Sequence, residues 1–232
     1  MAVSRAVMLR VGAGELPETL RLARPGAFVA FAKRDVVVSG YHDALRAARR
    51  EGFEAVLRLA GGRAAIFHED TIELGHAQPD PDPRARIHER FGRTSLRIAA
   101  ALRGLGVDAR VGEVPGEYCP GRYSVNARGT SKLAGVGQRV VAGGSHTGVV
   151  LVVAGEERIR RALGPVYSAL GLEWRPEVTG SVANENGSAA WTSVRDALID
   201  EYARDYDVVE SELDDDTLAL ARRLAPEHRP PQ

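Results

Sequence analysis

The stretch SKLAGVGQRVVAGGSHTGVVLVVAG, residues 131–155, decides the fold. It predicts a β-hairpin that turns at Gly143-Gly144, because β-branched residues recur in both arms and paired glycines accept the positive φ angles of a tight turn.

The first arm of this hairpin carries a lysine among small residues. Regular strand alternation predicts that Lys132, Ala134, Val136 and Gln138 share one face. The small neighbours, Gly135 among them, leave room for a long, thin ligand beside the lysine.

Strands and helices alternate irregularly along the rest of the chain. Further strands are predicted at 27–31, 35–40, 54–60, 63–69, 71–78, 108–114 and 122–127. Helices are predicted at 42–52, 84–105, 156–171 (interrupted near Gly164-Pro165), 192–206 and 215–225. This order indicates an α+β fold, with a mixed, mainly antiparallel sheet flanked by helices. We expect residues 1–232 to form a single catalytic domain without a C-terminal accessory domain.

Composition narrows the class of protein. The formal net charge of the 232 residues is zero, which disfavours a nucleic-acid or membrane-surface partner. The N-terminus lacks the apolar core of a signal peptide, and the apolar run at 148–155 is too short to cross a bilayer. A single cysteine suits a reducing compartment, so a cytoplasmic location is expected.

Lysine is scarce in this chain. Lys33 and Lys132 are two of 31 basic residues, so 31 minus 2 leaves 29 arginines. Arginine keeps its proton at any accessible pH, whereas a partly buried lysine can lose its proton or stabilise a neighbouring thiolate. Either chance or a need for an amine explains a lysine at position 132.

The only cysteine, Cys119, lies in the segment GEYCPGRYSVNARG at 116–129. The following Pro120 and Gly121 predict a turn, where a thiol is more accessible than in a strand. Two interpretations stay open: a structural loop cysteine or a nucleophile. Along a straight hairpin Cys119 and Lys132 would be roughly 20 Å apart, so they meet only if the turn folds the cysteine back over the sheet.

A second glycine-rich segment is RLAGGRAAIFHED, residues 58–70. Gly61 and Gly62 allow backbone N–H groups to approach an anion or a carbonyl, and Arg58 and Arg63 add positive charge. The same residues also suit an ordinary turn. None of the histidines, His68 and His146 included, has the spacing of a zinc site, so no metal is expected.

Together these segments resemble the biotin/lipoate protein ligase family, which includes the lipoyl and octanoyl transferases. The similarity rests on RLAGGRAAIFH, on GTSKLAGVGQRV and on GGSHTGVVLVV, and it covers about residues 20–205. The YCPG segment and the Gln138-Arg139 pair are most similar to the cysteine-dependent transferases and amidotransferases of lipoyl assembly.

The resemblance implies roles for individual residues. Cys119 corresponds to the acyl-accepting nucleophile, and Lys132 to its activating partner, which would accept or relay a proton. The implied substrate-binding residues come from the glycine segments and the two histidines: Arg58, Gly61, Gly62, Arg63, His68, Gly135 and His146.

The resemblance also implies a reaction. An octanoyl or lipoyl group would move from acyl carrier protein or glycine-cleavage H protein, through a Cys119 thioester, to a lysine of a lipoyl domain of a 2-oxoacid dehydrogenase or of the H protein. This transferase requires no cofactor. The alternatives are a lipoate–protein ligase that uses ATP and Mg²⁺ through an acyl-adenylate, and a binding module without catalytic activity.

Overall fold

A six-stranded sheet forms the centre of the computed structural model, which describes residues 1–231. Every pair of neighbouring strands in it is antiparallel. In spatial order the strands are β1 (Thr19–Ala23), β5 (Thr71–Pro79), β9 (Gly144–Val152), β8 (Ser131–Val141), β7 (Val125–Ala127) and β6 (Ala109–Val111). The hairpin predicted from residues 131–155 is therefore confirmed as β8 and β9, the long inner pair of this sheet.

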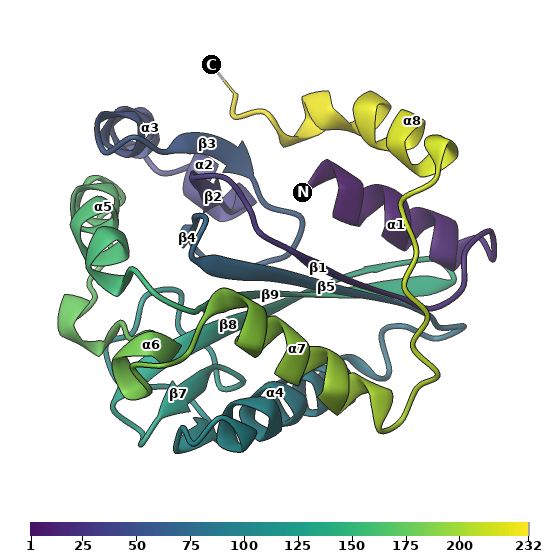
Figure 1. Ribbon diagram of the computed structural model, residues 1–232. Coiled ribbons are helices and arrows are strands. Elements are labelled where there is room, and N and C mark those ends of the chain that lie inside the picture. The colour runs from purple at the N-terminus through teal and green to yellow at the C-terminus, as the bar shows by residue number, and fades with distance from the viewer. Residues whose placement is uncertain (232) are drawn as a thin grey trace.

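A smaller sheet of three strands lies above one end of the large sheet (Figure 1). Its central strand is β2 (Phe28–Phe31), which pairs in parallel with β3 (Glu54–Leu57) and antiparallel with β4 (Ala65–Phe67). Because β3 and β4 lie on opposite sides of β2, the Gly61-Gly62 segment crosses from one edge of the sheet to the other. It is not the turn of a hairpin.

Helices cover both faces of the large sheet (Figure 1). On one face α4 (Ile87–Gly104) and α7 (Trp191–Ala203) pack over an apolar core that includes Ile98 and Leu151. On the other face lies α1 (Ala2–Gly12), with α8 (Asp215–Leu224) against it. The predicted α+β class, with a mainly antiparallel sheet flanked by helices, is confirmed.

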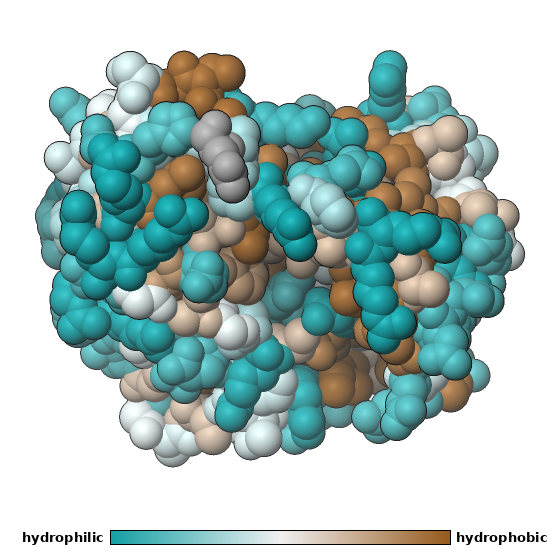
Figure 2. Space-filling view, turned by 90° about the horizontal axis from the view of Figure 1, so that it is seen from above, coloured by the Kyte–Doolittle hydropathy of each residue, from teal (hydrophilic) through white to brown (hydrophobic). Residues whose placement is uncertain are grey.

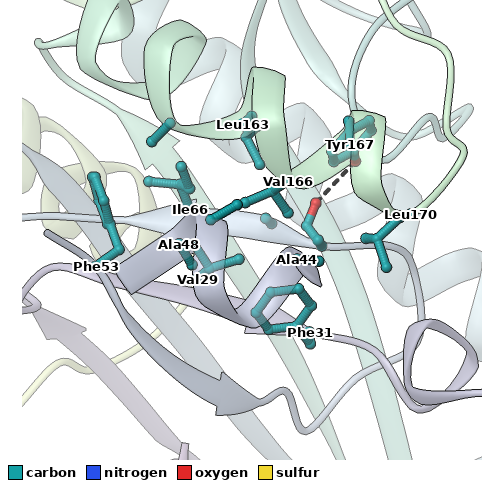
Figure 3. Packing of buried hydrophobic residues seen from close by; sticks show 14 of the residues in the cluster. Val29, Phe31, Ala44, Ala48, Phe53, Ile66, Leu163, Val166, Tyr167 and Leu170 are labelled. Atoms are coloured by element: carbon teal, nitrogen blue, oxygen red, sulfur yellow. Dashed lines mark hydrogen bonds between the residues drawn. The ribbon is translucent and has the colours of Figure 1, made fainter. Parts of the chain in front are cut away.

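The small sheet has a core of its own. Its apolar side chains pack with those of α3 (Tyr41–Arg50) and α5 (Glu156–Ala169), as the close-up in Figure 3 shows for Phe31, Ala44, Ile66 and Val166. The remaining elements are single turns: α2 (Lys33–Val36), α6 (Val182–Glu185) and the 3₁₀ turns η1 (Pro176–Val178) and η2 (Ala225–His228).

Three local predictions are wrong. Residues 35–40 do not form a strand: residues 33–36 form the helical turn α2, and the carboxylate of Asp35, the third residue of this turn, accepts a hydrogen bond from the Ala32 N–H at its start (2.9 Å). Helix α5 continues through Pro165 without interruption. The β8–β9 turn lies at Ala142-Gly143, one residue earlier than predicted, since Val141 pairs with Gly144 and Gly143 takes the positive φ of 74°.

The surface is largely polar on the face that carries α3 and α8. Figure 2 shows this face mostly in the teal of hydrophilic side chains, with brown side chains between them. Among residues 1–231 no helix is both long and apolar enough to cross a membrane.

Candidate active site

A cavity of about 440 Å³ lies against β8 and β9, lined by residues of the small sheet and by residues of α4. Its volume is within the roughly 300–1,000 Å³ typical of small-molecule sites. The glycines Gly135, Gly137 and Gly148 form part of its wall, and the absence of side chains there leaves a groove along the two strands. Apolar side chains supply much of the remaining lining: Ala65, Phe67, Ile87, Phe91, Val136 and Val150.

A β-bulge puts Lys132 into this cavity. Asn126 pairs with Lys132 and Val125 with Ala134, so Leu133 is an extra residue in β8. The bulge reverses the alternation, and the predicted face of Lys132, Ala134, Val136 and Gln138 is wrong. Lys132 instead shares its face with Gly135, where an added Cβ would lie 3.6 Å from the lysine Nζ.

Cys119 is folded back over the sheet at the side of the cavity. Its backbone has a φ of +44°, which non-glycine residues rarely adopt. The Cys119 N–H donates to the hydroxyl of Tyr167 on α5 (2.8 Å), and that hydroxyl donates to the Ala64 carbonyl (2.9 Å), the bond dashed beside Tyr167 in Figure 3. The strained turn is thus tied to the core of the small sheet.

Two N–H groups from the glycine segment contact the thiol. The Arg63 backbone N–H donates to Cys119 Sγ at 3.2 Å, and Arg58 Nη1 approaches the same atom at 3.5 Å. Burial alone raises the pKa of Cys119, but the charges of Arg58 and Lys132 and the Arg63 N–H outweigh it, so the pKa lies below its usual value. Cys119 therefore forms a thiolate more readily than an ordinary cysteine does.

Lys132 reaches the cysteine turn through its ammonium group. Nζ donates to the carbonyls of Tyr118 (2.9 Å) and Cys119 (3.0 Å) and to Glu117 Oε1 (2.9 Å), and the Lys132 side chain is fully buried. Three acceptors use the three protons of an ammonium. The Lys132 ammonium group is thus held beneath the cysteine turn by three hydrogen bonds.

Glu117 was not among the residues that we expected at the site. It forms a fully buried ion pair with Lys132 and accepts a hydrogen bond from Ser124 Oγ (2.5 Å). The sequence signal for it was weak: a carboxylate two positions before the cysteine, in a segment without helical or strand periodicity. Tyr167, inside an otherwise ordinary helix, carried no signal at all.

The glycine segment is as close to the thiol as its backbone permits. Gly62 has a φ of +122°, and an added Cβ would lie 2.9 Å from Cys119 Sγ and 2.7 Å from Arg58 Nη1. Gly61 also lines the cavity. The side chain of Arg63 points elsewhere, to Asp35 (3.1 Å), so its contribution to the site is the backbone N–H.

The two histidines lie in different places. His146 lines the cavity, with its ring over Gly75 and Gly148, where added Cβ atoms would come within 2.6 Å and 3.1 Å of it. Burial lowers the pKa of His146 to about 4, so the ring is neutral at pH 7. His68 is buried next to Gly155, at the start of α5, and is not among the residues that line the cavity. No group of three or more potential metal-ligating side chains occurs within residues 1–231.

These features define an α+β protein with a cysteine of lowered pKa beside a small-molecule cavity. Residues 1–172 match the family model of the lipoyl protein ligase A/B catalytic domain. The chain belongs to this family, as the resemblance in its sequence indicated.

Individual relatives extend this finding. The chain is 28% identical over 172 residues to an octanoyl-GcvH:protein N-octanoyltransferase of Geobacillus kaustophilus, covering 74% of this chain and 60% of the relative. It is 24% identical over 153 residues to a lipoyl-GcvH:protein N-lipoyltransferase of Listeria monocytogenes, covering 66% and 55%. The chain thus spans little more than half the length of these curated relatives.

Solved structures share the fold. A lipoate-protein ligase A bound with ATP superposes with a TM-score of 0.79 at 19% identity, over 97% of this chain and 88% of the ligase. A bi-partite lipoate protein ligase from Thermoplasma acidophilum superposes with a TM-score of 0.72 at 18% identity, over 97% and 86%. At this level of identity the likeness concerns the fold alone.

Proposed function

We propose that this protein is an acyltransferase of protein lipoylation that carries an octanoyl or lipoyl group as a thioester on Cys119. The observation that carries the proposal is the setting of one sulfur atom. Cys119 Sγ lies at a largely apolar cavity, where the positive charges of Arg58 and Lys132 act on it and the Arg63 backbone N–H is directed at it. Such a site favours a thiolate and holds an acyl chain next to it.

In the first step the thiolate attacks the acyl carbonyl of the donor. A carbon–sulfur bond forms, the bond to the donor breaks, and the donor group leaves with a proton from solvent. As the sulfur loses its negative charge, the Arg63 N–H and the Arg58 guanidinium become free to stabilise the oxyanion of the tetrahedral intermediate.

In the second step an acceptor lysine amine attacks the thioester. The new amide forms, the carbon–sulfur bond breaks, and the amine releases a proton to solvent. Lys132 stabilises the returning thiolate by its charge, because its three protons are already donated to Glu117 and two carbonyls. This assigns Lys132 an electrostatic role, and the proton transfer that we expected of it is not needed.

The relatives suggest the protein partners. Their names describe the transfer of an octanoyl or lipoyl group from GcvH, the glycine-cleavage H protein, to a protein. We therefore propose the H protein as one partner of this chain. Acyl carrier protein as donor and the lipoyl domains of 2-oxoacid dehydrogenases as acceptors follow from the resemblance to the family.

The transferase requires neither ATP nor a metal, because exchange of a thioester for an amide is downhill and exchange between two lysine amides is nearly thermoneutral. An ATP-dependent ligase is the second candidate, since a structural neighbour binds ATP. In that reaction Lys132 would contact a phosphate, which requires it to release one of its three acceptors. The geometry around Lys132 therefore favours the transferase.

Intact-mass spectrometry tests the proposal. The protein is incubated without ATP with octanoyl-loaded H protein or octanoyl-loaded acyl carrier protein, alongside Cys119→Ala. We expect an octanoyl adduct that hydroxylamine removes and that Cys119→Ala lacks. Formation of octanoyl-adenylate from octanoate and ATP, with no adduct from either donor, would instead identify a ligase. If neither the adduct nor the adenylate forms, the remaining interpretation is a binding module without catalytic activity.

A further inference from the structure

A carboxylate lies beneath the cysteine turn, although the proposed chemistry does not use it. We infer that Glu117 is a positioning residue that keeps Lys132 charged under the Cys119 thiol and that acts through Lys132 rather than on the sulfur directly. This inference rests on the proposed function of Cys119 as an acyl-accepting thiolate.

The Glu117 carboxylate joins several parts of one loop. Oε1 accepts hydrogen bonds from Lys132 Nζ (2.9 Å), Ser124 Oγ (2.5 Å) and the Gly121 N–H (3.1 Å), and Oε2 accepts one from the Val114 N–H (3.0 Å). The bond to Gly121 spans Cys119 and so closes the turn that presents the thiol. Glu117 thereby fixes the loop from 114 to 124 and the position of the ammonium group together.

Charge gives Glu117 its second effect. Both side chains of the Lys132–Glu117 pair are fully buried. In such a place an ammonium group without an anionic partner tends to lose its proton, because burial disfavours the charged form. Neutral Lys132 would no longer stabilise the thiolate. Glu117 thus affects the sulfur indirectly: it stabilises the ammonium form of Lys132, and the charge of Lys132 stabilises the thiolate.

Other groups around the thiol limit how strongly a change at Glu117 can alter the thiolate population. Arg58 approaches Sγ from the end of β3, the Tyr167 hydroxyl contacts the Cys119 N–H from α5, and the Tyr118 ring packs 4.8 Å from Lys132 Nζ. Arg58 remains when Glu117 is replaced. We therefore expect a reduced thiolate population without its complete loss.

The test measures the rate at which iodoacetamide alkylates Cys119 between pH 5 and 10. Four proteins are compared: wild type, Glu117→Gln, Lys132→Met and the double variant. We expect Glu117→Gln to raise the midpoint of the profile by about one pH unit, which lowers the rate at pH 7 about tenfold. In the Lys132→Met background the same change should leave the midpoint unchanged or lower it.

Glu113→Gln is the matched control, because Glu113 is an exposed carboxylate directly before this loop, between β6 and β7. It should leave the profile at the wild-type midpoint. The double variant also guards against misfolding, since it buries neither an unpaired ammonium nor an unpaired carboxylate. Thermal unfolding of each variant checks this directly.

Two results would overturn the inference: a Glu117→Gln midpoint equal to or below that of the wild type, or an equal rise in both backgrounds. The test is independent of acyl transfer. If Glu117→Gln raises the midpoint only when Lys132 is present, but the wild type forms no octanoyl adduct, the proposed function fails while the role of Glu117 stands. If the adduct forms but the effect of Glu117→Gln does not depend on Lys132, only the inference about Glu117 fails.

Discussion

Two buried pairs of a cation and a carboxylate contact strand β8, one through Lys132 and the other through a hydrogen bond to Gln138. Lys132 and Glu117 meet at 2.9 Å on the cavity side, with both side chains fully buried. Arg90 and Asp80 meet at 2.5 Å near the start of α4, with side chains 2% and 5% exposed. Arg90 also donates to Gln138 Oε1 on β8 (3.1 Å) and to the Pro83 carbonyl.

The two cations differ in the number of structural elements that each one connects. The broad guanidinium of Arg90 links a loop, a helix and a strand, which is a structural task suited to its planar fork. The compact ammonium of Lys132 fits beneath a single turn, where it donates to the Cys119 carbonyl and its charge lowers the pKa of the thiol. In a chain with 29 arginines, the lysine stands where a small cation is required.

Exchanging the two cations is the strongest way to break this comparison. We expect Lys132→Arg to lower acyl transfer by about 100-fold or more, because the larger group displaces the Cys119 turn. Arg90→Lys should keep transfer within about twofold and lower the free energy of unfolding by about 1–2 kcal/mol. Octanoyl transfer assays and urea unfolding measure these effects. Similar losses of transfer in both variants would show that the pairs do not differ in role.

Gly62→Ala tests whether space around the thiol matters as much as charge. The new methyl group would lie 2.9 Å from Cys119 Sγ, at a φ of +122° that side chains avoid. We expect transfer to fall by about 10- to 100-fold. Gly26→Ala is the control, because nothing lies within 4 Å of an added Cβ there and its φ is not positive. Equal activity of the two variants would contradict the close contact.

His146 extends the comparison to a buried group that stays neutral. Its pKa of about 4 in the folded protein lies below the ordinary value of 6.5. Between pH 4 and pH 6.5 the unfolded chain therefore binds a proton at His146 more readily than the folded protein does. Stability should therefore fall as the pH drops from 6.5 toward 4, by on the order of 2 kcal/mol at pH 5. Urea unfolding of wild type and His146→Gln at pH 7.5 and pH 5 isolates this loss. Identical pH dependence in both proteins would contradict it.

Tyr167→Phe gives the smallest expected effect. It removes the acceptor of the Cys119 N–H, which should cost about 1 kcal/mol of stability and lower transfer a few-fold. Tyr41→Phe is the control: its buried hydroxyl has no hydrogen-bond partner in residues 1–231, and its removal should be neutral or slightly stabilising. Thermal unfolding and transfer assays would show whether the two variants can be told apart.

Much of the fold could be predicted because its signals are local. The periodicity of residues 84–105 predicted α4, and the runs of β-branched residues predicted β8 and β9. Helix α1 and strand β1 were not predicted, since their stability comes from packing on the large sheet. The bulge at Leu133 was equally invisible, because it depends on the register with β7.

The candidate site was predicted only in part. The glycines, the cysteine and the lysine stand out by residue type, and the structure brings Arg58, Gly62, Cys119 and Lys132 together. Glu117 and Tyr167 do not stand out, because carboxylates and tyrosines are common. Their roles come from contacts with residues distant in the sequence, such as Lys132 and Ala64.

The sequence by itself determined the fold class, most of the strands and helices, the β8–β9 hairpin and the residue types at the site, since propensity, periodicity and glycine conformation act over a few residues. Only the tertiary structure decided that Lys132 faces the cavity, that Cys119 bends back over it and that Glu117 completes the charge pair. Each of these depends on the register of strands and on the packing of loops far apart in the chain, and short-range preferences carry no information about such contacts.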